Sequence, residues 1–112
     1  MAFEKICSLD DVWEGEMEAF ETSDGQEVLI ICVGPGEVRA VQGICPHQEI
    51  PLVEGTYKDG VLTCRAHLWQ FDVETGRGIN PTDCQIAQYK VRIDGDDVYV
   101  DVEGVEAIRS HS

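Results

Sequence analysis

The sequence has few basic residues and no long apolar run. Its 112 residues include only 8 Lys and Arg against 22 Asp and Glu, a formal net charge of −14 with neutral histidines. Such a surface repels nucleic-acid phosphates and anionic lipids, so we expect neither as a partner. The best apolar run, Val28 to Val33, has six residues and is too short to span a bilayer. The acidic surface would attract a basic protein partner, or it serves only to keep a small protein in solution.

The sequence also lacks an export signal and the even cysteine count of a disulfide framework. Its first residues, Met1 to Lys5, have no basic flank followed by an apolar stretch, so we expect a cytoplasmic protein. The cysteines number five, an odd count: Cys7, Cys32, Cys45, Cys64 and Cys84. Without an export signal, free thiols or metal ligands are the better interpretation.

The sequence has no sustained helical periodicity of apolar residues, and its pattern predicts short strands separated by turns. Residues 27–33 and 37–42 flank Gly34-Pro35-Gly36, which predicts a hairpin. A second hairpin is predicted around Gly95-Asp96, because valines and isoleucines alternate with polar residues on both sides. Further strands are predicted over residues 61–64 and 68–73, a short helical turn capped by Ser8 over residues 8–13, and a frayed tail over residues 105–112. We therefore predict one all-β domain over residues 1–112, a sandwich or small barrel.

Two short motifs combine a cysteine with a histidine. They are Cys45-Pro46-His47 and Cys64-Arg65-Ala66-His67, with sixteen residues between His47 and Cys64. Two irons joined by sulfides can take one thiolate and one imidazole from each motif. A single Zn²⁺ held by two cysteines and two histidines is the competing interpretation. Zinc fingers, however, usually place two cysteines in one half of the site and two histidines in the other. In the plainest alternative, these residues are core thiols and surface histidines.

The sequence resembles the Rieske [2Fe–2S] proteins in these two motifs. The resemblance extends to Cys64-Arg65-Ala66-His67-Leu68-Trp69-Gln70-Phe71-Asp72, and Gly78-Ile79-Asn80-Pro81 resembles the family's proline loop. It implies an antiparallel β-sandwich or barrel whose small cluster-binding subdomain presents two loops at one tip. The loops fall within residues 43–72 and the proline loop within residues 78–83. It also implies one [2Fe–2S] cluster, with Cys45 and Cys64 on one iron and His47 and His67 on the other.

The sequence departs from the high-potential members of this family. In those proteins a disulfide joins the two loops, at positions that Ile50 and Ala66 occupy here. They also donate hydroxyl hydrogen bonds to sulfur, from positions that Trp69 and Phe71 occupy here. Because donors at sulfur stabilise the reduced cluster, we predict a low potential, roughly −150 mV.

The implied function is that of a monomeric electron carrier and not of an enzyme, since no catalytic set is found. The sequence most resembles the ferredoxin components of toluene-type monooxygenases, notably in Phe3-Glu4-Lys5-Ile6-Cys7 and Cys45-Pro46-His47-Gln48-Glu49-Ile50. This resemblance implies electrons arriving from an NADH-dependent flavoprotein reductase and leaving for a diiron hydroxylase. The alternatives are the ferredoxin of an aromatic-ring dioxygenase, a nitrite reductase small subunit and a zinc-binding interaction module.

The remaining candidates flank the ligands or lie apart from them. We interpret Cys7, Cys32 and Cys84 as structural thiols, with Cys32 buried in its strand. Loop packing or a docking rim would explain the residues beside the ligands, with the rim favoured for two of them, Gln48 and Pro81. The full set is Gln48, Glu49, Arg65, Trp69 and Pro81.

Overall fold

Ten strands in two antiparallel sheets build the part of the chain that the computed structural model describes, residues 3–46, 50–65, 69–80 and 85–105. The larger sheet has six strands, in the order β1 (Glu4–Ser8), β10 (Asp97–Asp101), β9 (Gln88–Asp94), β4 (Glu37–Gln42), β3 (Glu27–Gly34) and β2 (Met17–Glu21). The smaller sheet has four strands, β5 (Thr56–Lys58), β6 (Val61–Thr63), β7 (Gln70–Asp72) and β8 (Gly78–Asn80). The predicted all-β class is confirmed.

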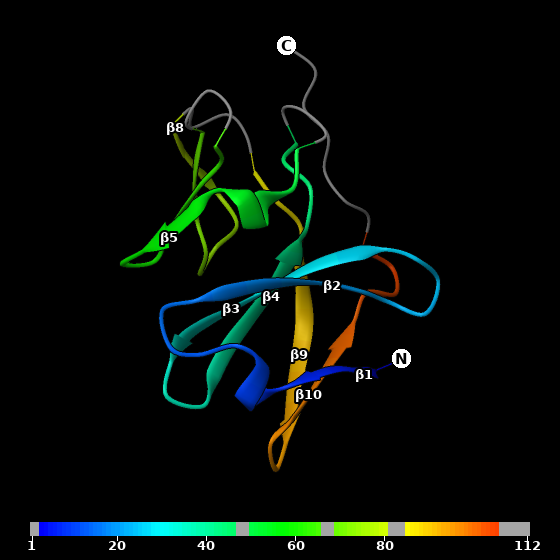
Figure 1. Cartoon of the computed structure of the whole chain (residues 1–112). Helices are drawn as coiled ribbons and strands as arrows, with labels where there is room; N and C mark the ends of the chain where they lie inside the picture. The colour runs from blue at the N-terminus through cyan, green and yellow to red at the C-terminus, as the bar shows by residue number, and fades with distance from the viewer. Residues whose placement is uncertain (1–2, 47–49, 66–68, 81–84, 106–112) are drawn as a thin grey trace.

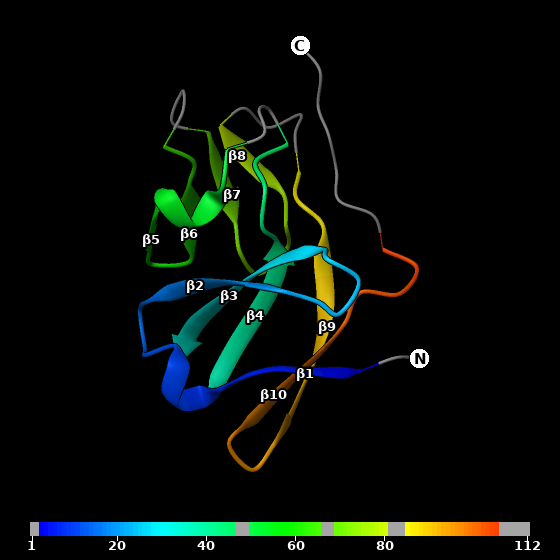
Figure 2. The ribbon, with the colours of Figure 1, turned by 45° about the vertical axis from the view of Figure 1, so that its right-hand side comes forward.

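The larger sheet curls until its two edges approach each other (Figures 1 and 2). Glu4 on β1 accepts hydrogen bonds from the backbone N–H and the hydroxyl of Ser23, at 3.0 and 3.3 Å, in the turn after β2. These bonds tie the edge strand β1 to the other side of the sheet. The result is a nearly closed antiparallel barrel, on which the smaller sheet stands (Figure 1).

Strand β3 is buried on both faces because it separates two apolar cores. Val28, Ile30 and Cys32 point into the core of the barrel. Leu29 and Ile31, the alternate residues, point into a second core beneath the smaller sheet. The unbroken apolar run in the sequence is therefore one strand that serves two cores.

Both predicted hairpins are present. Strand β3 pairs with β4 and β9 pairs with β10, each antiparallel. The predicted helical turn is also confirmed in a shorter form, η1 (Leu9–Asp11). Ser8 caps it by accepting the Asp10 N–H at 3.3 Å, and its own N–H donates to the Asp11 carboxylate at 2.9 Å.

Several strands were not predicted, and one prediction was wrong. Strands β1, β2 and β5 carry many charged or exposed residues, which hides their alternation. The expected loop at Gly78 to Asn80 is instead strand β8, which pairs with β7 through Phe71 opposite Gly78. The rest of the predicted proline loop, residues 81–83, and the tail after residue 105 lie outside the described residues. Within the described ranges, no helix has the length and apolarity to cross a membrane.

Candidate metal centre

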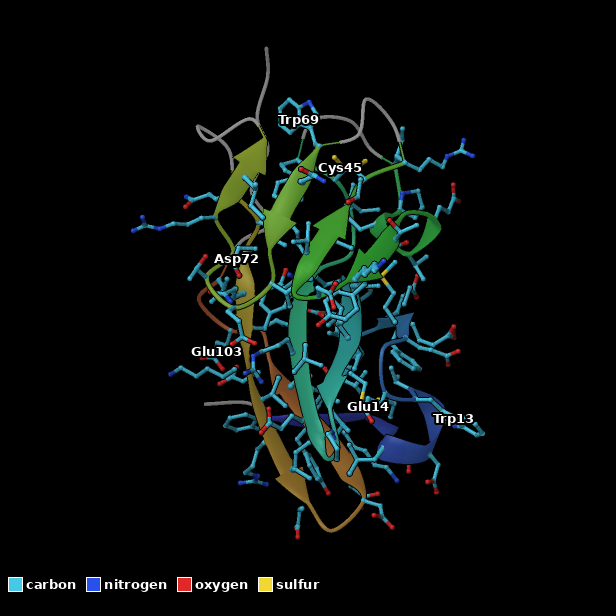
Figure 3. All side chains as sticks on the ribbon, turned by 90° about the vertical axis from the view of Figure 1, so that its left-hand side faces the viewer. Trp13, Glu14, Cys45, Trp69, Asp72 and Glu103 are labelled. Carbon is cyan, nitrogen blue, oxygen red and sulfur yellow. The ribbon has the colours of Figure 1, made fainter. Side chains whose placement is uncertain are left out.

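The structure brings Cys45 and Cys64 into one buried group at the tip of the smaller sheet. Their exposed fractions are 3% and 0%, and both belong to the second core, which also contains Leu62 and Phe71. Cys45 follows β4 through a short connection, and Cys64 follows directly on β6. Figure 3 shows Cys45 at this end of the molecule, beside Trp69. Two cysteines that are 19 residues apart in the sequence thus belong to one buried cluster at the end of the molecule where the motifs predict the metal centre.

Both cysteines begin loops that are closed in the same way. The Cys45 N–H donates to the Ile50 carbonyl at 2.9 Å, and the Cys64 N–H donates to the Trp69 carbonyl at 2.7 Å. Each hydrogen bond spans five residues and encloses one histidine in the sequence, His47 or His67. The histidines themselves lie outside the described residues. The matched closures hold each cysteine backbone at the start of its loop.

The cysteine pair fits the sulfur half of a mixed-ligand site. Within the described ranges, no group of three Cys, His, Asp or Glu side chains is placed to hold a metal ion. Further ligands for a metal at the pair would therefore come from outside those ranges, where His47 and His67 lie. The ligand set with two thiolates on one iron and two imidazoles on the other stays a prediction, of which the structure describes the two cysteines.

A short helix and a glycine support the two loops from below. The helix η2 (Leu52–Glu54) buries Leu52 completely, and the Leu52 N–H donates to the Gly43 carbonyl at 2.8 Å. Gly55 follows the helix and packs against the backbone just before Cys64. A Cβ atom on Gly55 would overlap the Thr63 carbonyl oxygen. No sequence motif marked Gly55, because its role depends on a contact between separate segments.

The two positions where the high-potential proteins donate hydroxyl hydrogen bonds to sulfur carry no hydroxyl in this chain. Phe71 is fully buried in the second core and Trp69 packs against that core. Ile50 stands where the high-potential proteins have a cysteine, and the other such position, Ala66, lies outside the described residues. Phe71, Trp69 and Ile50 thus support the basis of the low-potential prediction, which itself stays a prediction.

One ion pair lies directly beside the second loop. The Arg65 Nε is 3.3 Å from the Glu54 carboxylate, and both side chains are well exposed. Of the predicted docking rim, only Arg65 and Trp69 are described. Gln48, Glu49 and Pro81 fall outside the described residues.

The other described cysteines belong to the barrel core. Cys7 and Cys32 are each 5% exposed there, separate from Cys45 and Cys64, which confirms the predicted burial of Cys32. The Cys32 thiol donates to the Gly34 carbonyl at 3.2 Å. Burial raises the pKa of Cys7 from its ordinary 9.0 to about 11, with a further contribution from the Asp11 charge. Cys84 lies outside the described residues.

Comparison with known proteins gives a family for most of the chain. The model of the Rieske [2Fe-2S] domain matches residues 2–90. The ferredoxin component of the alkene monooxygenase system of Xanthobacter autotrophicus is 41% identical over 99 residues, which are 88% of this chain and 80% of that one. The ferredoxin component of biphenyl 2,3-dioxygenase from Rhodococcus jostii is 40% identical over 105 residues, which are 93% of this chain and 96% of that one.

Solved structures agree with these relatives. The ferredoxin of carbazole 1,9a-dioxygenase from Nocardioides aromaticivorans has a TM-score of 0.80 and 29% identity, covering 89% of this chain and 97% of that one. A ferredoxin in complex with its carbazole 1,9a-dioxygenase oxygenase has a TM-score of 0.79 and 25% identity, covering 88% of this chain and 91% of that one.

Proposed function

Because the chain belongs to the Rieske [2Fe–2S] family, we propose that it is the electron-carrying ferredoxin of a multicomponent monooxygenase. It would take one electron at a time from an NADH-dependent flavoprotein reductase. It would deliver that electron to a diiron hydroxylase of the toluene monooxygenase type. The same scheme favours the cytoplasm, where NADH is available.

We assign four ligands to the single [2Fe–2S] cluster of the family. Cys45 and Cys64 would hold one iron as thiolates, and His47 and His67 would hold the other as neutral imidazoles. When bound, the cluster accepts and releases one electron. The protein's contribution is to exclude water from the thiolates and to hold both loops at one tip, within reach of a partner.

The observation that carries this proposal is the buried pair of Cys45 and Cys64, each at the start of a loop closed five residues later. Relatives named as ferredoxin components of both monooxygenase and dioxygenase systems support electron delivery to an oxygenase. The solved complex of a similar ferredoxin with its oxygenase supports a direct contact between the two proteins.

The ferredoxin of an aromatic-ring dioxygenase is the second candidate. It is supported by the biphenyl dioxygenase relative, which is as similar as the alkene monooxygenase relative and is covered over more of its length. Both candidates use the same cluster and fold. They differ only in the protein that receives the electron.

The cluster is tested by electron paramagnetic resonance of the dithionite-reduced protein, with iron and acid-labile sulfide analysis. We expect the low average g value of a Rieske centre and equal iron and sulfide. A silent sample containing zinc would reject the proposal. Turnover by purified diiron hydroxylase and by purified Rieske dioxygenase, each supplied with this ferredoxin and an NADH-dependent reductase, then separates the two candidates.

A further inference from the structure

Gln42 is a fully buried polar side chain at the base of the first ligand loop. Its exposed fraction is 1%, and it lies at the end of β4. Its carboxamide Nε2 donates to the Ile44 carbonyl at 2.7 Å, and its Oε1 accepts the Ala87 N–H, also at 2.7 Å. The side chain therefore joins the residue just before Cys45 to the start of the segment that leads into β9.

The Gln42 carboxamide continues the hydrogen-bond ladder between β4 and β9 at the point where the two backbones diverge. Strand β4 pairs with β9 through Ala40 and Val41. At the next step, the Gln42 N–H still donates to the Ala87 carbonyl at 3.0 Å, but the Ala87 N–H donates to the Gln42 side chain. The backbone of residues 43 and 44 therefore leaves the sheet and turns toward Cys45. The buried Ala87 N–H and the buried Gln42 carboxamide still keep hydrogen-bond partners.

The second attachment of Gln42 lies on the segment that leads into β9. In the sequence, Ile86 and Ala87 follow shortly after residues 81–83, the part of the predicted proline loop that lies outside the described residues. The Ile86 N–H donates to the Gly76 carbonyl at 2.7 Å, which fixes this segment to the turn before β8. Gln42 therefore links the residue just before Cys45 to the segment at Ile86 and Ala87.

We propose that Gln42 is a positioning residue for the cluster, whose carboxamide fixes the backbone before Cys45 relative to the segment at Ile86 and Ala87 and so sets the reduction potential. This inference rests on the proposed [2Fe–2S] function. The groups that hold a ligand in place tune a metal centre, because they set the ligand's orientation and the hydrogen bonds around it. Without the carboxamide, the Ile44 carbonyl and the Ala87 N–H lose their buried partner. The backbone at Cys45 would then shift to satisfy them.

The test compares Gln42→Met with Gln88→Met in the intact, cluster-loaded protein. Methionine keeps the side-chain length and removes both hydrogen-bonding groups. Gln88 is the control because its side chain also joins two separate segments. Gln88 is exposed, and its Nε2 donates to the Val73 and Glu74 carbonyls at 3.0 and 2.9 Å, in the turn after β7. These carbonyls belong to a turn and not to a ligand loop.

We expect Gln42→Met alone to shift the midpoint potential, to broaden the electron paramagnetic resonance lines and to lose its cluster several-fold faster than Gln88→Met. Equal potentials and line shapes in the two variants would overturn the inference, even if both were less stable than the wild type. Absence of a Rieske signal from the wild type would instead contradict the proposed function.

Gln42→Glu provides a second variant if Gln42→Met does not fold. At mildly acidic pH a carboxyl this deeply buried is protonated, so it can still donate to Ile44 and accept from Ala87. We expect its potential and line shape at that pH to match the wild type. A shifted potential under these conditions would count against a positioning role for the hydrogen bonds.

Discussion

At the scale of single residues, the four cysteines that the structure describes divide into two pairs with different expected roles. Cys45 and Cys64 belong to the second core, whereas Cys7 and Cys32 belong to the barrel core. We expect Cys45→Ser to lose most of its iron and sulfide, because a serine oxygen is a poor substitute for a thiolate ligand. Cys32→Ser is the matched control, since its hydroxyl can still donate to the Gly34 carbonyl. Full metal content in Cys45→Ser would contradict the ligand assignment.

The Cys7 thiol gives a prediction for alkaline stability. Its pKa is about 11 in the folded protein against 9.0 ordinarily, because burial disfavours the thiolate. Below the ordinary pKa both states hold the proton, so this group makes no difference. Between these two values only the unfolded chain loses the proton, so stability falls as pH rises, by on the order of 2 kcal/mol in all.

Thermal unfolding measured across that pH range checks this expectation. Burial also raises the pKa of Tyr89, so the wild type loses stability through both groups. Cys7→Ala should show a smaller decline in Tm between neutral and alkaline pH than the wild type does. An identical decline would mean that Cys7 ionises as readily in the folded state as in the unfolded chain.

The residues beside the cysteines predict the potential. Phe71 and Trp69 supply no hydroxyl to sulfur, and the acidic surface opposes the charge added on reduction. We therefore expect a midpoint near the low end of the Rieske range, roughly −150 mV. A redox titration monitored by visible absorbance measures it. A strongly positive midpoint would show that other donors reach the cluster.

At the scale of elements, the contact beneath the second loop is the most sensitive to added volume. Gly55 leaves no room for a Cβ beside the Thr63 carbonyl, and Cys64 is the next residue. We expect Gly55→Ala to displace this backbone and to lower cluster content by more than half, as measured by iron per protein. Gly34→Ala on β3 is the control, because its new Cβ would contact only Glu37, at 3.8 Å.

The sequence predicted elements whose pattern is local and missed those whose pattern depends on neighbours. Strands β9 and β10 alternate around a turn, so their hairpin was predictable. Strand β2 exposes Glu18 on one face and Glu21 on the other, so no simple alternation marks it in the sequence, and it is identified only by its pairing with β3.

The same distinction applies to the site. Cys45 and Cys64 were found by their motifs, because ligand chemistry restricts residue type and spacing. Gly55 and Gln42 were not found, because a close approach and a buried carboxamide acquire their meaning only when distant segments meet. Placement of His47 and His67 stays a prediction.

At the scale of the whole molecule, the net charge of −14 predicts how the carrier meets its partners. Attraction to a basic docking surface raises the encounter rate, and salt screens it. We expect the second-order rate of electron delivery to the oxygenase to fall about tenfold as salt rises from low to molar concentration. Stopped-flow kinetics measures it, with reduction by a small uncharged donor as control. A flat salt dependence would leave solubility as the only role of the charge.

The position of strand β3 between the two cores has a further consequence for how the protein unfolds and aggregates. Its alternate side chains belong to the two cores. Unfolding of either the barrel or the smaller-sheet end would therefore expose one apolar face of β3 to water. A carrier whose cluster end opens would present Leu29 and Ile31 to water on a strand still held in the barrel. Such a partly unfolded molecule exposes apolar strand surface that can associate with other molecules. We therefore expect loss of the cluster to lead to aggregation more readily than to reassembly of the cluster.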